Sequence, residues 1–438
     1  MNLRITTLVL CTGGFAVPIV AQSVAQNPEL MALTGTSPLV LRQHTTAVDC
    51  RPTACSLGAT LAGSGAALAG GAAWDGRQGR LWVSNGRQLT LAGVRGTERC
   101  SVQCQPFLAP LLTGTTTTRV TGLAYLAGGM SPGHPAGDGV LFLSYSNQYL
   151  AWASSRGCTL SKVTGYSMLR TLGPNRAIGG LAVDALRGFL FMATSKTGTA
   201  SPTNIIFVSR ADQPGVPFCR FGIVVDSAKC LNVRLGPISG LAYDVSNRQL
   251  YVTDGRTLVY GKLSLTQSTT GWVCRFAHSG CCTNLSSEPL VGLAMAPPAS
   301  LNVGRPCAVG GCAPCANMRS GSIGDAVLGN PAFQLTLDNA PTNFRMALLG
   351  IGFGPCGATG FDLGLCGVVR IAIAPFRPLI LPIPGSGTGG GCNGAVRLPL
   401  PVPVDEALLN VQLSTQWVLL CPNNGNGTSN CLQLRISG

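Results

Sequence analysis

The chain has 438 residues, of which 46% are hydrophobic and only 11% are charged. The formal net charge of +14 arises from scarce acidic residues and not from runs of basic ones, so a nucleic-acid partner is not expected. The scattered arginines are interpreted as a solvated face, and weak adhesion to polyanions such as acidic polysaccharide is the alternative. The 58 glycines and 29 prolines indicate many turns, and no stretch of a dozen residues has helical periodicity. These features predict an all-β protein.

Residues 1–25 are predicted to be a signal peptide. Arg4 precedes an apolar stretch, residues 5–20, that is short and interrupted by glycine and proline, and small residues follow it. No later stretch reaches the roughly 18 consecutive apolar residues of a membrane-spanning helix. We therefore expect a bacterial protein that is secreted or held in the cell envelope, without a transmembrane segment and as a monomer.

A short pattern built on Gly-Leu-Ala recurs through the first 300 residues. Its glycines are 51, 58, 60 and 52 residues apart, at Gly71, Gly122, Gly180, Gly240 and Gly292. A period near 50 in a β-rich chain is typical of β-propeller blades with four strands each. Glycine suits the innermost strand, where neighbouring blades approach closely.

Further strand patterns follow each of these glycines. After Gly240, the apolar segments 250–253 and 258–260 flank an Asp254-Gly255 turn, and the segment 273–276 carries Cys274. Residues 30–33, 39–41 and 48–51 match the second, third and fourth strands of a blade. They are predicted to pair with residues 290–296 in a three-plus-one closure, which removes open sheet edges. The count predicts a five-bladed propeller, with six blades as the alternative.

Residues 240–255 resemble the repeats of NHL and YVTN-type β-propellers, and this resemblance extends over about residues 29–298. It implies a binding platform more than a reaction, because those families are largely binding scaffolds. Residues 320–438 resemble a C-terminal β domain of uncharacterised secreted bacterial proteins, through 329–333, 339–341 and 381–384. No activity follows from that resemblance.

The domain organisation follows from these patterns. The propeller is predicted over residues 26–298, a linker rich in Cys, Pro and Gly over 299–322, and a small β-sandwich of about seven strands over 323–438. The last domain is interpreted as a unit for surface attachment or sugar contact, or as a spacer.

The 18 cysteines that remain after removal of the signal peptide predict disulfides formed in an oxidising compartment. Short loops favour pairs within hairpins: Cys50 with Cys55, Cys100 with Cys104, Cys219 with Cys230, Cys274 with Cys281 or Cys282, Cys356 with Cys366, and Cys421 with Cys431. The partners of Cys158, Cys282, Cys307, Cys312, Cys315 and Cys392 stay open. Zinc or redox chemistry at Cys312 and Cys315 is the less favoured interpretation, since no second pair with this spacing accompanies them.

Three aspartates occupy the same turn of the repeat, directly after the inner strand: Asp75, Asp184 and Asp244. Their oxygens could hold calcium or magnesium at one mouth of the propeller. Turn-forming aspartates that bond their own backbone are the favoured interpretation.

Three aromatic residues precede that turn: Trp74, Tyr125 and Tyr243. They could stack on sugar rings around the mouth, although packing between blades is favoured. No catalytic motif of the lipase, phosphate-loop or zinc-protease type is present in the sequence, and no catalytic residue is assigned.

The leading hypothesis is a secreted, non-catalytic binding or structural protein whose propeller face binds a glycan or a protein. The alternative is a cation-dependent propeller hydrolase or lactonase, with its metal held by Asp75, Asp184 and Asp244. A third possibility is a purely structural component of the cell envelope. No cofactor is assigned, and bound calcium is the alternative.

Overall fold

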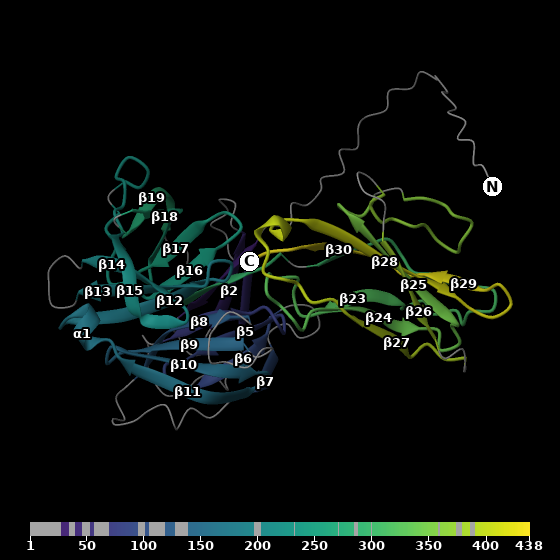
Figure 1. Ribbon diagram of the computed structural model, residues 1–438, viewed down its shortest axis with the longest axis horizontal. Coiled ribbons are helices and arrows are strands. Elements are labelled where there is room, and N and C mark those ends of the chain that lie inside the picture. The colour runs from purple at the N-terminus through teal and green to yellow at the C-terminus, as the bar shows by residue number, and fades with distance from the viewer. Residues whose placement is uncertain are drawn as a thin grey trace, which may run out of the picture.

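The computed structural model describes residues 28–34, 40–45, 53–56, 70–94, 101–104, 119–127, 139–196, 203–231, 233–269, 271–283, 288–298, 300–357, 360–373, 379–385 and 390–438. Strands make up 59% of the structure and helix 2%, which confirms the all-β prediction. None of the described helices is long and apolar enough to cross a membrane. The described strands form one group of five sheets and a second group of two (Figure 1).

Each of the first five sheets has four antiparallel strands. Four of the sheets take their strands consecutively from the chain. They are β4 (Gly71–Asp75), β5 (Arg80–Ser84), β6 (Leu89–Gly93) and β7 (Ser101–Cys104); β8 (Val120–Leu126), β9 (Gly139–Tyr145), β10 (Tyr149–Arg156) and β11 (Thr159–Ser167); β12 (Arg176–Asp184), β13 (Phe189–Lys196), β14 (Asn204–Arg210) and β15 (Gln213–Gly222); and β16 (Gly240–Asp244), β17 (Gln249–Thr253), β18 (Thr257–Ser268) and β19 (Gly271–Thr283). A short helix, α1 (Leu169–Leu172), connects β11 to β12.

The fifth sheet combines strands from two distant parts of the chain. Its order is β20-β1-β2-β3, with β20 (Leu290–Ala296), β1 (Glu29–Thr34), β2 (Val40–Thr45) and β3 (Thr53–Ser56). Strands β1 and β20 are antiparallel, and Leu30 lies opposite Met295. The predicted fourth strand of this sheet lies outside the described residues, and the strand described there is β3.

The first strands of the sheets surround a common axis. Strand β4 contacts β8, β8 contacts β12, β12 contacts β16, β16 contacts β20, and β20 contacts β4, which closes a ring of inner strands. A Cβ atom on Gly122 would lie 2.9 Å from the Gly180 Cα, and one on Gly292 would lie 2.9 Å from the Ala72 nitrogen. The recurring glycine is therefore required by the close approach of neighbouring inner strands.

Buried hydrophobic clusters fill the gaps between neighbouring sheets. Between the sheets of β4 and β8, for example, Trp82 and Leu91 pack in one cluster with Leu141 and Leu143. Trp82 in β5, Phe142 in β9 and Phe191 in β13 are fully buried. The sheets thus stabilise one another through their faces, as radially arranged sheets do.

Disulfides join neighbouring sheets near the rim of the ring. The described pairs are Cys104–Cys158, Cys219–Cys274 and Cys230–Cys281. The predicted pairings Cys100–Cys104, Cys219–Cys230 and Cys274–Cys281 are therefore wrong, and Cys282 is also disulfide-bonded. The physical reason is that outer strands of adjacent sheets, such as β15 and β19, contact each other. The predicted Cys50–Cys55 pair lies outside the residues whose side chains are described.

The remaining strands form two antiparallel sheets. The larger has the order β21-β30-β28-β25-β26. In addition, β29 pairs with β28, and β22 pairs with β29. The smaller sheet has the order β23-β24-β27. Their bounds are β21 (Leu301–Val303), β22 (Cys307–Val309), β23 (Arg319–Ile323), β24 (Gln334–Ala340), β25 (Met346–Phe353), β26 (Leu379–Pro384), β27 (Gly394–Pro399), β28 (Gln412–Leu420), β29 (Asn426–Thr428) and β30 (Cys431–Arg435), with a 3-10 helix, η4, at Glu406–Leu408. Residues 301–323, mostly expected to be a linker, thus supply strands to both sheets.

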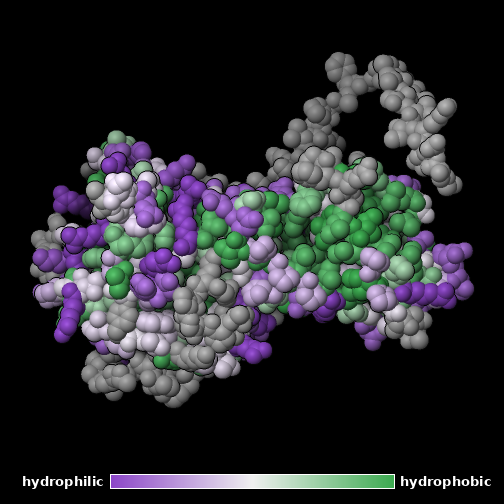
Figure 2. All heavy atoms as spheres, in the orientation of Figure 1, coloured by the Kyte–Doolittle hydropathy of each residue, from purple (hydrophilic) through white to green (hydrophobic). Residues whose placement is uncertain are grey.

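One hydrophobic core joins these two sheets. Trp417 in β28 is fully buried with Leu335 and Leu337 of β24, and its indole nitrogen donates a 3.1 Å hydrogen bond to the Thr336 carbonyl. Hydrophilic residues are prominent over the ring of sheets, whereas hydrophobic ones gather on the visible face of this second group (Figure 2).

The disulfides of the second group tie loops and early strands to the larger sheet or its neighbours. They are Cys307–Cys366, Cys312–Cys421, Cys315–Cys392 and Cys356–Cys431. The predicted hairpin pairs Cys356–Cys366 and Cys421–Cys431 are therefore wrong. Cys312 and Cys315 each form a disulfide with a distant cysteine, so neither has a free thiol that could bind zinc or exchange with the other.

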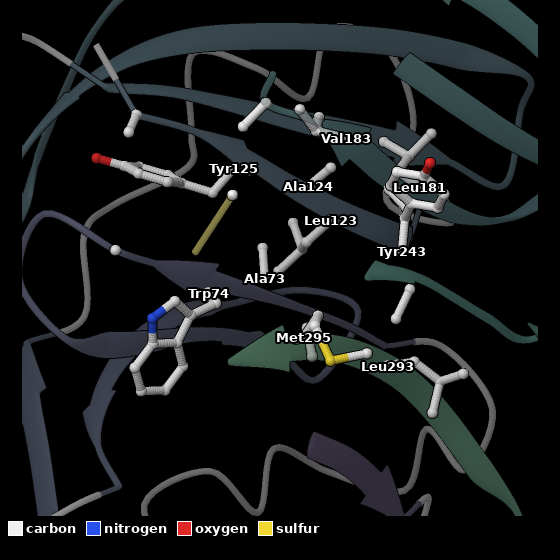
Figure 3. Close-up of a pocket in the computed structure, with 18 of the residues that line it drawn as sticks. Ala73, Trp74, Leu123, Ala124, Tyr125, Leu181, Val183, Tyr243, Leu293 and Met295 are labelled. Carbon is white, nitrogen blue, oxygen red and sulfur yellow. The ribbon is translucent and has the colours of Figure 1, made fainter. Parts of the chain in front are cut away.

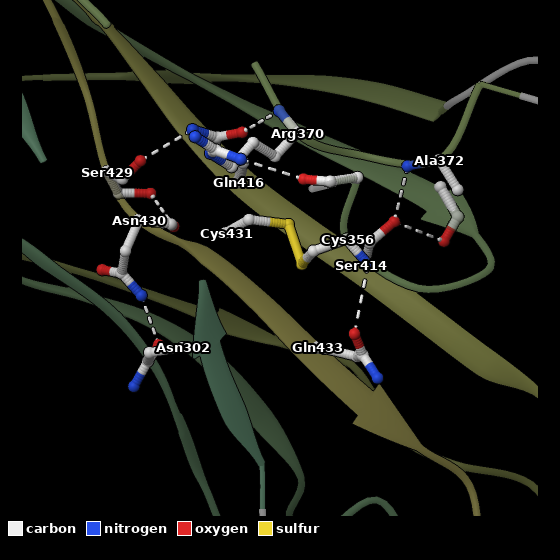
Figure 4. Close-up of a disulfide and its surroundings, with 12 residues drawn as sticks. Asn302, Cys356, Arg370, Ala372, Ser414, Gln416, Ser429, Asn430, Cys431 and Gln433 are labelled. Carbon is white, nitrogen blue, oxygen red and sulfur yellow. Dashed lines mark hydrogen bonds between the residues drawn. A yellow bond between two sulfur atoms is a disulfide. The ribbon is translucent and has the colours of Figure 1, made fainter. Parts of the chain in front are cut away.

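The loop that contains Cys356 is held by side chains of β28 and β30 as well as by its disulfide (Figure 4). The Gln416 side chain accepts a 2.7 Å hydrogen bond from the Arg370 nitrogen, and Gln433 accepts a 3.2 Å bond from the Cys356 nitrogen. These loop amides therefore find partners where no regular strand pairs with them.

Candidate functional site

The ring has two mouths, one at each end of its inner strands. We call the end at which β4, β12 and β16 finish the aspartate mouth, because Asp75, Asp184 and Asp244 are their last residues. We call the opposite end, where β8 begins after Arg119 and β12 begins at Arg176, the arginine mouth.

All three aspartates of the first mouth bond their own turns. The Oδ1 atom of Asp75 accepts from the Arg77 and Gln78 nitrogens at 3.0 and 3.3 Å. The Oδ1 atom of Asp184 accepts hydrogen bonds from the Leu186 and Arg187 nitrogens, both at 3.1 Å. The Oδ1 atom of Asp244 accepts hydrogen bonds from the Ser246 and Asn247 nitrogens at 2.9 and 3.2 Å. Such Asx-type turns stabilise the connection to the next strand.

Burial changes the protonation behaviour of these carboxyl groups. It raises the pKa of Asp75, Asp184 and Asp244, while hydrogen bonds from the turn amides act in the opposite direction. Among the described residues, no three His, Cys, Asp or Glu side chains are grouped so that they could hold a metal ion. The structure therefore places the three aspartates in separate turns and does not bring them together.

The three predicted aromatic residues line a cavity at the aspartate mouth (Figure 3). Trp74 and Tyr243 are only 8% and 5% exposed, and the Tyr243 ring packs 4.9 Å from that of Phe191. Burial and the adjacent Asp75 carboxylate raise the pKa of the half-buried Tyr125. The cavity has a volume of about 90 Å³ and mainly alanine, leucine and valine walls. It is smaller than ordinary ligand pockets, which span roughly 300–1,000 Å³.

The second group of sheets reaches into this mouth. Val327, Leu328 and Gly438 complete the wall of the cavity. The Trp74 indole nitrogen donates a 2.8 Å hydrogen bond to the Asp325 carboxylate. The Gly76 carbonyl accepts hydrogen bonds from the Asp325 nitrogen at 2.9 Å and from the Asn330 side chain at 3.2 Å. The mouth expected to be a ligand platform is thus covered by the chain itself.

Packing and charge extend this contact. A Cβ atom on Gly76 would lie 2.7 Å from a methyl group of Val327, so the two segments meet without space for a side chain. Arg248, in the turn after Asp244, forms a 3.0 Å ion pair with Glu406. The sequence contains no local signal for these contacts, because Trp74 and Asp325 are 251 residues apart.

At the arginine mouth, turns of one sheet bond the start of the next sheet. The Gly86 carbonyl accepts a 2.8 Å hydrogen bond from Val120, and the Gly255 carbonyl accepts one of 2.7 Å from Leu290. The Ser195 hydroxyl accepts a 2.8 Å bond from the Ile238 nitrogen. These links fix the turns around the mouth, so that this surface is preorganised.

Basic residues outnumber acidic ones on the described part of this surface. The basic residues in its turns, connections and strand ends are Arg87, Arg119, Arg170, Arg176, Lys196, Lys229, Arg234 and Arg256. The acidic ones are Asp226, Asp254 and Glu288, and the Asp254 carboxylate accepts three backbone hydrogen bonds, from Gly236, Arg256 and Thr257. This arrangement was not predicted, because the arginines are scattered in the sequence.

The arginine mouth also contains a polar cleft. It is an open depression of about 390 Å³ lined by Ser146, Asn147, Gln148, Asn175, Arg176 and Ala177. Gln148 and Asn175 both have positive φ angles, of 60° and 62°, in the turns that form its walls. The hydroxyl, amide and guanidinium groups of the lining can bond a polar or anionic ligand.

Comparison with known proteins gives no family. No protein-family model matches the chain, and no curated protein matches it in sequence. The chain is similar to the solved structure of the Dos1 propeller, with 10% identity, coverage of 70% of this chain and 61% of that one, and a TM-score of 0.29.

Two further solved structures are similar to this chain to about the same degree. The Nup133 β-propeller domain of Vanderwaltozyma polyspora gives 9% identity, coverage of 55% and 82%, and a TM-score of 0.28. Raptor of Chaetomium thermophilum gives 13% identity, a TM-score of 0.29, and coverage of 62% of this chain but only 21% of that one. None of these likenesses assigns an activity.

Proposed function

We propose that the protein is a secreted binding scaffold that acts as a monomer and binds its ligand at the arginine mouth. In this proposal the five four-stranded sheets are the blades of a five-bladed β-propeller, closed by the pairing of β1 with β20. The second group of sheets is a β-sandwich that covers the aspartate mouth and braces the ring.

The observation that carries the proposal is the difference between the two mouths. At the aspartate mouth, Asp325 bonds Trp74 and Val327 packs on Gly76. At the arginine mouth, Asn147 is exposed and lines an open polar cleft, and Arg87 is exposed in a turn at the same end of the ring. Among the described residues, the segments that close the first mouth do not reach the second one.

The disulfides support an extracellular location for such a scaffold. Described pairs cross-link both the rim of the ring and the loops of the second domain, and disulfides persist mainly in oxidising compartments. Cross-links between sheets also keep a binding surface rigid, which lowers the entropy lost on binding.

A steric block tests where the platform lies. Asn147→Trp puts a large side chain into the cleft, whereas Gln267→Trp puts the same side chain on the exposed outer part of β18. We expect the full-length Asn147→Trp protein to lose retention on cell-envelope material and the Gln267→Trp protein to keep it. Equal retention of the two variants would show that the arginine mouth is not the platform.

A further inference from the structure

We infer that the cleft of the arginine mouth binds a linear polysaccharide that carries carboxylate or sulfate groups. This inference rests on the proposed function and adds the chemical class of the ligand. It depends on how the basic residues are connected, how their charge is balanced and what else lines the cleft.

The basic residues follow one another across three consecutive sheets. Arg87 follows Gly86, whose carbonyl bonds the nitrogen of Val120, the neighbour of Arg119. The Arg119 carbonyl accepts a 2.8 Å hydrogen bond from the nitrogen of Ser146, which lines the cleft.

The connection continues on the other side of the cleft. The Gln148 side chain donates a 3.2 Å hydrogen bond to the Gly173 carbonyl. It also donates a hydrogen bond to the Arg176 carbonyl. Turns that carry Arg87, Arg119 and Arg176 are therefore joined by hydrogen bonds across three consecutive sheets, and Arg176 lines the cleft. Such a row of basic residues suits an extended anionic chain better than a single small anion.

The charge of these arginines is not neutralised within the described part of the chain. Arg187, Arg210 and Arg248 each have a carboxylate within 4.0 Å, but no such partner is found among the described residues for Arg87, Arg119 or Arg176.

Arg176 is held by neutral acceptors instead. Its Nη1 donates to the Thr203 carbonyl at 3.2 Å and to the Thr194 hydroxyl at 3.4 Å. These bonds position the guanidinium, and no carboxylate among the described residues neutralises it.

The other groups of the cleft fit sugar hydroxyls. Ser146, Asn147 and Asn175 contribute a hydroxyl and two amides, which can both donate and accept. None of the described residues that line the cleft is aromatic, although stacking on aromatic rings is the usual means of binding single-stranded nucleic acid. The lining therefore offers hydrogen-bonding groups for sugar hydroxyls and contains no ring on which a base could stack.

The test compares two double variants that lose the same charge. Arg87→Ser with Arg119→Ser removes charge beside the cleft, and Arg156→Ser with Arg275→Ser removes it from exposed positions away from this mouth. Binding of the full-length proteins to polygalacturonate, dextran sulfate, neutral dextran and single-stranded DNA is measured at two salt concentrations. Thermal unfolding of each variant checks that it is folded.

We expect the wild type to bind at least one of the two acidic polysaccharides, polygalacturonate (carboxylate) or dextran sulfate (sulfate). This binding should weaken as the salt concentration rises, and neutral dextran should not bind. The cleft variant is expected to bind about tenfold more weakly, equivalent to about 1.4 kcal/mol, and the control variant to bind normally. Equal losses in the two variants, tighter binding to DNA, or binding to neutral dextran would overturn the inference.

The steric variant separates failure of this inference from failure of the proposed function. If Asn147→Trp loses retention on envelope material while neither acidic polysaccharide binds the wild type, the platform is correct and the ligand class is wrong. If Asn147→Trp keeps full retention and neither polysaccharide binds, both the platform and the ligand class are wrong.

Discussion

The indole nitrogen of Trp74 donates a 2.8 Å hydrogen bond to the carboxylate of Asp325, although the two residues are 251 positions apart. Trp74 belongs to an inner strand of the ring, and Asp325 follows β23 of the second group of sheets. Together with the backbone bond from Asp325 to the Gly76 carbonyl, this contact fastens the second domain over the aspartate mouth. Removal of the contact should therefore be measurable as a loss of stability.

The Asp325→Ala variant is expected to unfold more easily than the wild type by about 1–3 kcal/mol, because a buried indole donor loses its acceptor. Equilibrium unfolding in denaturant measures this difference. The matched control is Asp362→Ala, at an exposed aspartate of the same domain. Equal stability of the two variants would mean that the Trp74–Asp325 contact contributes nothing to docking.

The Gly76→Ala variant is expected to lose about 1–3 kcal/mol, because its new methyl group would lie 2.7 Å from a Val327 methyl. The Val327→Ala substitution removes that obstacle. The double variant should therefore be more stable than the sum of the two single losses predicts, which a double-mutant cycle by thermal or chemical unfolding measures. Strict additivity would contradict direct packing of the two residues.

The rim disulfides predict a specific peptide map. Digestion without reduction should yield Cys219 linked to Cys274, and Cys230 linked to Cys281. Replacement of both Cys219 and Cys274 by serine should cost up to about 4 kcal/mol, since the bond closes a loop of 55 residues. A peptide in which Cys219 is linked to Cys230 would instead support the hairpin pairing.

The protonation of Asp184 predicts a pH dependence. Burial raises its pKa in the folded state above the ordinary value of 3.8, so the folded state binds the proton more tightly than the unfolded state does. This contribution to stability is complete below pH 3.8 and is lost as the pH rises through the raised pKa. The Asp184→Asn variant should lack that dependence, so its stability relative to the wild type should be higher at pH 7 than at pH 3.5. Chemical unfolding at the two pH values measures the difference, and a relative stability that is equal or lower at pH 7 would contradict it.

Chelation tests the cation hypothesis at the aspartate mouth. Because Asp75, Asp184 and Asp244 already accept hydrogen bonds from their own turns, EDTA is expected to leave the thermal midpoint unchanged. A lowered midpoint that calcium restores would show that these carboxylates, or others in the chain, bind a cation. Elemental analysis of the purified protein provides an independent measurement.

The sequence was informative where one residue type is required at a repeated position. The recurring glycines locate the inner strands because any Cβ at Gly122 or Gly292 would collide with the neighbouring strand. The Asx turns at Asp75 and Asp244 follow equally from local chemistry. Period and turn chemistry are local properties, so a single sequence reveals them.

The disulfides and the covered mouth depend on contacts between sheets, which local patterns do not encode. Short loops favoured pairs such as Cys219–Cys230, but the observed rim pairs are separated by 54, 55 and 51 residues. These separations are close to the repeat period, so cysteines one repeat apart were a usable signal. No comparable signal links Gly76 with Val327.

Hydroxyl-radical footprinting of Trp74 tests most directly whether the second domain covers the aspartate mouth. In the intact protein, Trp74 is expected to be oxidised much more slowly than Trp272, which is only half-buried on β19. The Asp325→Ala substitution should raise the rate at Trp74 and leave that at Trp272 unchanged. Oxidation of Trp74 as fast as that of Trp272 in the wild type would show that this mouth is open, and would contradict the account.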